Sequence, residues 1–148
     1  MPSLAKNKKA FHDYEILETF EAGIQLLGPE VKSCKASNCN LKGGYVDIDS
    51  KHQVWLNEVH ISPYKFANKN NPNPTRKRKL LLNEKEILKI LKQLNETGTT
   101  CVPLEMYTKG GLIKIKIALV RGKKLYDKRA DLKKKSQNLD IARALKRK

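Results

Sequence analysis

The chain has 148 residues, enough for one domain, and 39% of them are hydrophobic, so it can bury a core. Its 31 Lys and Arg against 15 Asp and Glu give a formal net charge of +16, which favours an anionic partner, nucleic acid before a membrane surface. No apolar run approaches the ~20 residues that span a bilayer, and no apolar segment follows the N-terminal lysines, so we expect a cytoplasmic protein.

The positive charge is concentrated at the C-terminal end. Residues 121–148 hold twelve Lys and Arg and three Asp, a net of +9, whereas residues 1–120 carry +7. This segment has too few apolar residues for a core, so we expect a basic tail that is disordered when free. Leu125, Leu132 and Leu139 lie seven residues apart, a weak helical pattern that would form only on binding. Residues 1–120 form the predicted body, of which residues 1–10 are expected to be flexible.

The body begins with the pattern of a half-buried strand. Tyr14, Ile16 and Phe20 are interleaved with glutamates, and the strand is expected to continue beyond Gly23, where a bulge would fit. The range Gly28–Cys34 is predicted to form a short helix, because a proline and a glutamate occupy its first turn.

The middle of the chain predicts short strands followed by a helix. The sequence predicts two paired strands around a polar turn, Tyr45–Ile48 and Val54–Leu56. A further apolar stretch is Val59–Ile61. Residues 68–75 are rich in Asn and Pro and indicate a loop. The range Glu84–Glu96 is predicted to be an amphipathic helix, which begins after an Asn N-cap with a Glu three residues later.

Two long strands are predicted at the end of the body. They are Thr99–Tyr107 and Leu112–Val120, and the second alternates Ile or Leu with Lys114 and Lys116. One face of that strand should therefore lie on the core and the other should be basic and exposed. Five or six strands in hairpin succession, with few helices between them, favour a mainly β fold, an antiparallel barrel with two or three helices.

The sequence gives little support for an enzyme active site or for a metal site. Cys34 and Cys39, with two histidines downstream, lack the spacing of structural zinc sites and are interpreted as small buried residues. Cys101 lies in an apolar strand, which predicts an inert thiol. Glycine-rich phosphate loops and nucleophile motifs are missing from the sequence. We expect no enzyme, no metal and no cofactor.

Basic and aromatic residues in the body suggest an RNA surface. The run Arg76–Lys79, together with Lys32, Lys35, Lys114 and Lys116, would bind phosphates if several of them shared one face of the barrel. The alternative is a solvated loop edge. Aromatic rings can stack on bases or pack in the core, and both remain open for three tyrosines. They are Tyr14, Tyr45 and Tyr64.

Seven short stretches form a more specific pattern than any of these features. They are Asn7-Lys-Lys-Ala10, Phe20-Glu-Ala-Gly-Ile24, Gly28-Pro-Glu-Val-Lys-Ser33, His60-Ile-Ser-Pro-Tyr64, Arg76-Lys-Arg-Lys-Leu-Leu-Leu82, Val102-Pro-Leu104 and Gly122-Lys-Lys-Leu-Tyr-Asp-Lys-Arg129. In this order, over nearly the whole chain, they resemble the SmpB family of SsrA-binding proteins.

The resemblance implies a bacterial ribosome-rescue adaptor without catalytic activity. The family has an oligonucleotide-binding-like (OB-like) β-barrel that binds the tRNA-like domain of tmRNA (SsrA RNA). With the elongation factor EF-Tu, it brings alanyl-tmRNA to stalled ribosomes for trans-translation. The tail becomes helical in the mRNA channel of the small subunit and takes the place of the codon–anticodon helix at the decoding centre, so that tagging of the nascent chain can start. The protein is expected to act as a monomer.

The resemblance also assigns residues to two sites. For tmRNA binding it implies Asn7, Tyr14, Glu21, Lys32, Arg78, Lys79 and Leu81. For the decoding centre and mRNA channel it implies Gly122, Lys123, Lys124, Tyr126, Asp127, Lys128 and Arg129. Arg78 and Lys79 would contact phosphates. Glu21 would accept from a base edge or position a basic neighbour, and Leu81 would support the surface or pack in the core.

Two other functions fit the same composition. A non-specific single-strand RNA-binding protein would use the same barrel and bind any RNA with similar affinity. A ribosomal structural protein with a basic extension would remain on ribosomes after a high-salt wash, whereas a rescue factor would leave.

Overall fold

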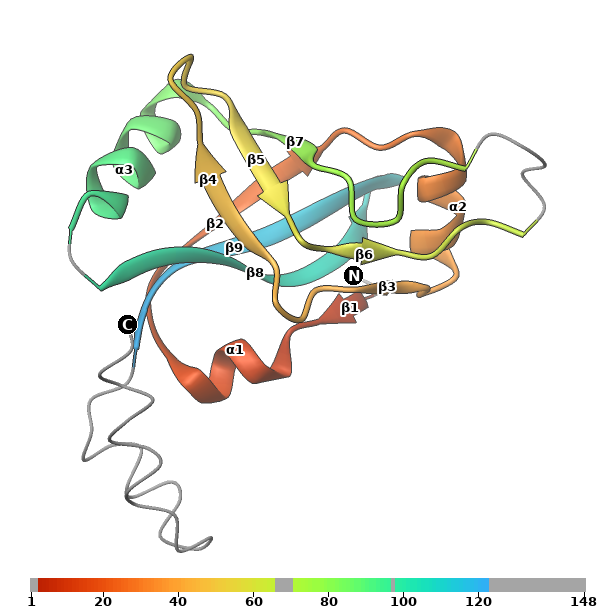
Figure 1. Ribbon diagram of the computed structural model, residues 1–148, viewed down its shortest axis with the longest axis horizontal. Helices are drawn as coiled ribbons and strands as arrows, with labels where there is room; N and C mark the ends of the chain where they lie inside the picture. The colour runs from red at the N-terminus through yellow and green to blue at the C-terminus, as the bar shows by residue number, and fades with distance from the viewer. Residues whose placement is uncertain (1–2, 66–70, 97, 123–148) are drawn as a thin grey trace, which may run out of the picture.

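The computed structural model describes residues 3–65, 71–96 and 98–122. This part of the chain is mainly β, with one curled antiparallel sheet, a small two-stranded ribbon and three short helices around them (Figure 1). The strands of the sheet, in spatial order, are β1 (Ser3–Lys6), β8 (Thr99–Lys109), β9 (Leu112–Gly122), β2 (Tyr14–Ile24), β7 (Arg78–Leu81), β5 (Val54–Asn57) and β4 (Tyr45–Ile48). The ribbon pairs β3 (Cys39–Asn40) with β6 (His60–Ile61). The helices are α1 (Lys8–Asp13), α2 (Gly28–Lys35) and α3 (Glu84–Leu94).

The long β8–β9 hairpin confirms the alternation predicted from the sequence. Four apolar side chains of β9 point into the main core, which lies inside the curl of the sheet, and the lysines between them point outward. Beyond Lys116 the outward positions of β9 become apolar as well. Ala118 and Val120 are buried there, because α1 covers this end of the sheet and packs Ala10 against them. The sheet therefore has a second, smaller core on its outer side. The four inward residues are Ile113, Ile115, Ile117 and Leu119.

The bulge predicted at Gly23 lies elsewhere in β2. The register of β2 against β9 shifts between Ile16 and Glu18, and the extra residue, Leu17, is exposed. Gly23 has a different constraint, since a Cβ there would lie 3.3 Å from the Cβ of Leu81 on the neighbouring strand. Its lack of a side chain lets β7 pair closely with the end of β2.

The predicted antiparallel barrel is confirmed only in part, because the sheet is not closed in the part of the chain that the structure describes. The sheet ends at β1 on one side and at β4 on the other, and no strand pairing joins these two edges. The start of β4 nevertheless packs against β8. A Cβ on Gly44 would lie 3.2 Å from Pro103 Cγ and 2.6 Å from Val59 Cγ2, so the chain approaches β8 too closely for a side chain. The curl is completed by packing rather than by a hydrogen-bonded ladder.

The ends of the body also differ from the prediction. Residues 1–10 are predicted to be flexible, but Ser3–Lys6 pairs with β8 and Lys8 begins α1. Short basic segments look mobile in a sequence, and only the partner strand supplies their hydrogen bonds. At the other end, β9 runs to Gly122, two residues beyond the predicted limit of the body at residue 120.

The predicted helices are confirmed, but α1 and the strands β1, β3 and β7 were not predicted. α2 and α3 begin where the sequence places them, and Asn83 accepts from the backbone N–H of Glu86 at 2.9 Å in the predicted capping box. β7 places Arg78 and Lys79, the second half of the basic run, in the middle of the sheet, although the sequence places that run at the edge of a loop.

Candidate nucleic-acid interface

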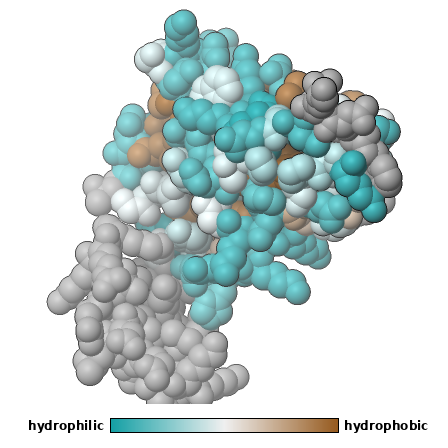
Figure 2. Space-filling view, turned by 45° about the vertical axis from the view of Figure 1, so that its right-hand side comes forward, coloured by the Kyte–Doolittle hydropathy of each residue, from teal (hydrophilic) through white to brown (hydrophobic). Residues whose placement is uncertain are grey.

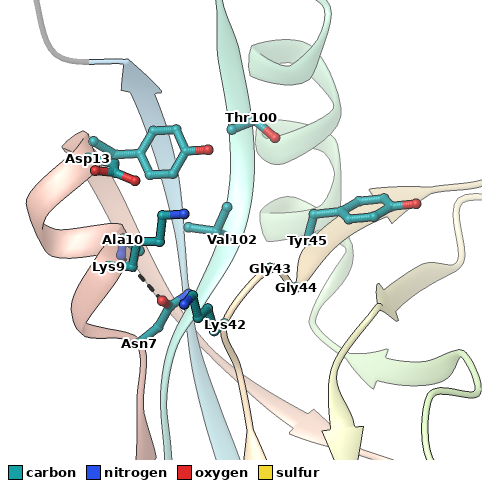
Figure 3. Close-up of a pocket in the computed structure, with 11 residues that line it drawn as sticks. Asn7, Lys9, Ala10, Asp13, Lys42, Gly43, Gly44, Tyr45, Thr100 and Val102 are labelled. Atoms are coloured by element: carbon teal, nitrogen blue, oxygen red, sulfur yellow. Dashed lines mark hydrogen bonds between the residues drawn. The ribbon is translucent and has the colours of Figure 1, made fainter. Parts of the chain in front are cut away.

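A cleft of about 720 Å³ separates α1 from the segment that leads into β4, with β8 as its floor. In Figure 3, Lys9 and Tyr45 lie on opposite sides of this α1 cleft, with Val102 and Thr100 between them. Lys42 adds a second ammonium group, and Tyr45 is 43% exposed. Two lysines beside an exposed ring offer both a phosphate contact and a stacking surface.

Asn7 stabilises the walls of the α1 cleft, and its side chain is not exposed there. Its side chain is buried and accepts from the Ala10 N–H at 3.3 Å, which caps α1. Its Nδ2 donates to Pro103 O at 2.9 Å and to Leu41 O at 3.5 Å. One amide thus holds together α1, β8 and the loop before β4, the three walls of the α1 cleft. These structural contacts are sufficient to explain an asparagine at position 7 without a contact to RNA.

Tyr14 and Glu21 lie on the same side of the sheet, the side on which α1 packs. Tyr14 packs against the small outer core and lines the α1 cleft. Glu21 lies farther along β2, beyond the bulge, opposite Lys116, which in turn pairs with Glu105 on β8. We call the side chains of β2, β7, β8 and β9 that point to this side the outer face. Its members beyond the small core are Glu21, Gly23, Lys79, Leu81, Glu105, Tyr107, Lys114 and Lys116.

Glu21 is fixed by two donors from β8. The Tyr107 hydroxyl donates to Oε2, and Lys109 Nζ lies 3.2 Å from Oε1. These hydrogen bonds, the Tyr107 bond first, lower the pKa of the Glu21 carboxyl. Burial and the same carboxylate raise the pKa of Tyr107 to about 12. Glu21 is therefore an ionised acceptor that also positions Lys109, which is one of the two roles the sequence suggests.

The outer face continues onto β7 and β5. Leu81 stands beside Gly23 and is 48% exposed, so it is a surface residue and not part of the core. Lys79 is paired with Trp55 of β5, and Lys77 Nζ lies 5.8 Å from the centroid of the Trp55 ring. The indole Nε1 donates to Asp49 at 3.0 Å, which fixes the ring. Lysines and an indole therefore extend the basic, aromatic surface beyond the predicted residues.

Arg78 does not belong to this surface. Its side chain is 0% exposed, and its guanidinium donates to Glu30 Oε2 at 2.8 Å, Val59 O at 2.6 Å and Pro74 O at 2.9 Å. All three nitrogens of its guanidinium donate to partners inside the protein. The expectation that Arg78 contacts phosphate conflicts with this geometry, because alternation along β7 turns it inward between two outward lysines.

Glu30 is the buried carboxylate in a charged cluster with Arg76 and Arg78. It also accepts from Arg76 Nε at 3.1 Å and from the backbone N–H of Leu27 at 2.9 Å. Burial raises the pKa of the Glu30 carboxyl, but the hydrogen bonds from Arg76, Leu27 and Arg78 outweigh it and leave the pKa lowered. The cluster joins the start of α2 to β7 and to the loop before it.

The remaining predicted residues are distributed as follows. Lys32 is exposed on α2, which packs beside β6 and contributes nothing to the α1 cleft. Gly122 ends β9 and pairs with Tyr14, so the chain leaves the body next to the α1 cleft. The other decoding-centre residues, and the leucine repeat of the tail, lie outside the described residues. They are Lys123, Lys124, Tyr126, Asp127, Lys128 and Arg129.

Sequence reasoning missed several residues of this interface. Lys9 lies inside one of the seven stretches, and a signal for it was therefore present. Lys42 and Trp55 had no such signal, since only the curl of the sheet brings them to the surface described here. Within the part of the chain that the structure describes, no helix is long and apolar enough to cross a membrane, and no three His, Cys, Asp or Glu side chains are grouped as a metal site would require.

Comparison with known proteins gives a consistent result. A family model described as "SmpB protein" matches residues 4–147. The SsrA-binding protein of Lactococcus lactis subsp. cremoris is 54% identical over 143 residues, covering 97% of this chain and 92% of that protein. The SsrA-binding protein of Microcystis aeruginosa is 53% identical over 145 residues, covering 97% and 94%. A solved structure named "tmRNA-SmpB: a journey to the center of the bacterial ribosome" matches with a TM-score of 0.71 and 38% identity, covering 95% of this chain and 94% of that one.

Proposed function

The chain belongs to the SmpB family, and on that premise we propose that it binds the tRNA-like domain of tmRNA through the α1 cleft and the outer face. The relatives are named for binding SsrA RNA and not for a reaction, which supports a non-catalytic adaptor. The similar structure named for tmRNA, SmpB and the bacterial ribosome supports a role in trans-translation.

One observation carries the assignment of the surface. Tyr14 and Glu21 lie on either side of the bulge in β2 and Leu81 lies on β7, and all three are on the side of the sheet where α1 packs. Lysines surround them: Lys9 and Lys42 at the cleft, and Lys114 and Lys116 on β9. Lysines placed along one face attract phosphates and release counterions, while an exposed carboxylate and tyrosines supply directional contacts to bases or riboses.

The exit of the tail supports a division of roles between body and tail. Gly122 lies beside Tyr14, so a body bound to folded RNA by the cleft would release the basic residues 123–148 from the edge of the same interface. We propose that this segment enters the mRNA channel of a stalled ribosome and acts there in place of the codon–anticodon helix, while EF-Tu accompanies the alanyl-tmRNA. The protein would act in the cytoplasm as a monomer, without a cofactor.

The surface is tested by binding the tRNA-like domain of tmRNA in competition with unrelated RNA of equal length. We expect Lys9→Met and Lys42→Met to weaken binding, each with a decrease of roughly 0.7–0.9 in the slope of log K against log salt. Lys85→Met is the matched control, because Lys85 is an exposed lysine on α3, outside the cleft and the outer face. Equal affinity for the unrelated RNA would favour the non-specific single-strand binder.

The division of roles is tested by a chain that ends at Gly122. We expect it to bind the tRNA-like domain like the full chain and to fail in tagging of the nascent chain on stalled ribosomes. Alanine at Asp127, Lys128 and Arg129 together should give the same result. Retention of either protein on ribosomes after a high-salt wash would favour a structural subunit, and normal tagging by either variant would contradict the role of the tail.

A further inference from the structure

Three sulfur atoms from α2, β3 and β8 meet in the main core. Cys34 on α2 and Met106 on β8 are both fully buried, and Cys39 on β3 is half-buried between them. Cys39 Sγ lies 3.9 Å from Met106 Sδ. The Cys34 thiol forms a hydrogen bond with the Cys39 sulfur. Both cysteines are free.

The turn that ends α2 brings the two cysteines together. Ser37 adopts a left-handed conformation with φ of 61°, and its N–H donates to Cys34 O at 2.9 Å. The next amide, of Asn38, reaches back to Ser33 O at 2.9 Å, which completes a Schellman motif. The chain therefore reverses over the last turn of the helix and enters β3 at Cys39. Hydrogen bonds from the Ser62 N–H to Asn38 O and from the Ser33 hydroxyl to Ser62 O hold the two sides of the turn against the same loop.

The two thiols have different surroundings. The hydrogen bond from Cys34 lowers the pKa of Cys39, against the effect of burial, and the positive charge of Arg78 adds to the lowering. The same hydrogen bond and burial raise the pKa of Cys34, and Glu30 adds a smaller effect in that direction. Cys39 is therefore the thiol of the pair that ionises more readily, and Cys34 is its hydrogen-bond donor. Cys101 lies apart from both on β8, and burial raises its pKa to about 12.

We propose that Cys39 and Cys34 form a site of reversible oxidation by hydroperoxides, in which Cys39 reacts first and Cys34 resolves it to a disulfide. The Cys39 thiolate attacks one oxygen of the peroxide, the O–O bond breaks, and the leaving oxygen takes up a proton and departs as water or an alcohol. The sulfur becomes a sulfenic acid. Cys34 then attacks Cys39 Sγ, the S–O bond breaks, and water leaves with the proton of Cys34. The two sulfurs supply the two electrons that reduce the peroxide.

The geometry favours this order of events. Half-exposure lets a small peroxide reach Cys39, whereas Cys34 is screened from solvent and already hydrogen-bonded to the sulfur it would attack. A partner in contact resolves a sulfenic acid before a second peroxide can oxidise it further. Met106 fills the remaining side of Cys39 with an apolar thioether, and a thioether cannot form a disulfide.

The experiment treats the reduced full-length protein with hydrogen peroxide and then counts free thiols after unfolding. We expect the count to fall from three to one, with Cys101 as the remaining thiol, and peptide mapping without reductant should link Cys34 to Cys39. Dithiothreitol should restore all three thiols. A Cys101→Ala variant serves as the matched control, and it should lose both of its thiols at the rate of the parent protein.

Two further variants separate the roles of the cysteines. In Cys34→Ser the sulfenic acid on Cys39 should persist and be trapped by dimedone. In Cys39→Ser the thiol of Cys34 should survive exposure that oxidises the parent protein completely. The proposal is overturned if the parent keeps three thiols under conditions that modify Cys39 in Cys34→Ser, if Cys39 accumulates a sulfinic acid with Cys34 free, or if the disulfide joins two copies of the chain. Circular dichroism of each variant before oxidation verifies that the fold is intact.

Discussion

Arg78 and Lys79 are neighbours on β7, and we expect their replacement by methionine to have opposite consequences. Arg78→Met removes three buried hydrogen bonds and leaves the carboxylate of Glu30 in the interior with Arg76 and one backbone donor. Removing one partner of a buried ion pair costs about 3–5 kcal/mol. Because Arg76 still compensates Glu30, we expect about 3 kcal/mol, a large part of the roughly 5–15 kcal/mol of a typical domain. Lys79 points to the outer face, so Lys79→Met should change stability by no more than about 0.5 kcal/mol.

Urea unfolding followed by fluorescence of Trp55, the only tryptophan, measures both free energies of unfolding. Binding to the tRNA-like domain is measured below the unfolding transition of each variant and corrected for the folded fraction. We expect the affinity of Arg78→Met to equal that of the parent protein, and the affinity of Lys79→Met to fall together with its salt slope. An Arg78→Met protein of unchanged stability that binds RNA more weakly would refute the assignment of Arg78 to the interior and restore it as a phosphate contact.

Three other substitutions and conditions test the fold around the interface. Ser37→Gly should raise the free energy of unfolding in urea by about 0.5–1 kcal/mol, because glycine adopts the left-handed conformation without strain; a decrease would contradict the observed φ. The pKa of Glu30 is lower in the folded state than its unfolded value near 4.5. The ionised carboxylate therefore stabilises the fold fully above pH 4.5, and this contribution is lost as the pH falls through the folded pKa. Urea unfolding at a series of acid pH values should show this loss, and Glu30→Gln should lack it. Gly44→Ala should cost about 1–3 kcal/mol in thermal or urea unfolding because its Cβ would meet Val59, whereas Gly28→Ala, with open space around it, should cost far less; equal effects would refute the close approach.

Local patterns along the chain predicted most of the secondary structure. The capping residues of α3 and the alternation of β9 depend only on neighbours in sequence, and both are found as predicted. The N-terminal strand was not predictable in this way, since Ser3–Lys6 is too short to show a pattern and gains its structure from β8, about a hundred residues away. The same reason applies to the open sheet. Closure depends on whether β4 and β1 meet, which no local pattern decides.

The candidate site was predicted less completely than the fold. The resemblance to a family assigned Asn7 and Arg78 to tmRNA binding, yet their contacts show that both stabilise the structure from inside. A motif identifies residues that matter and does not say whether they face the ligand. Lys42 illustrates the converse, because it enters the cleft only where the loop before β4 packs against β8, a contact that follows from tertiary structure.

The bulge in β2 explains how the predicted RNA residues come to share one surface. Tyr14 and Glu21 are seven positions apart, and in a regular strand an odd separation places two side chains on opposite faces. The extra residue at Leu17 reverses the alternation, so that Tyr14 and Glu21 point to the same side, while Phe20 and Ala22 enter the main core. From Glu21 the face passes to Gly23 and Leu81 by ordinary pairing. One inserted residue thus lets a single strand carry both the small core under α1 and the exposed carboxylate, and it makes a continuous interface out of positions that simple alternation would separate.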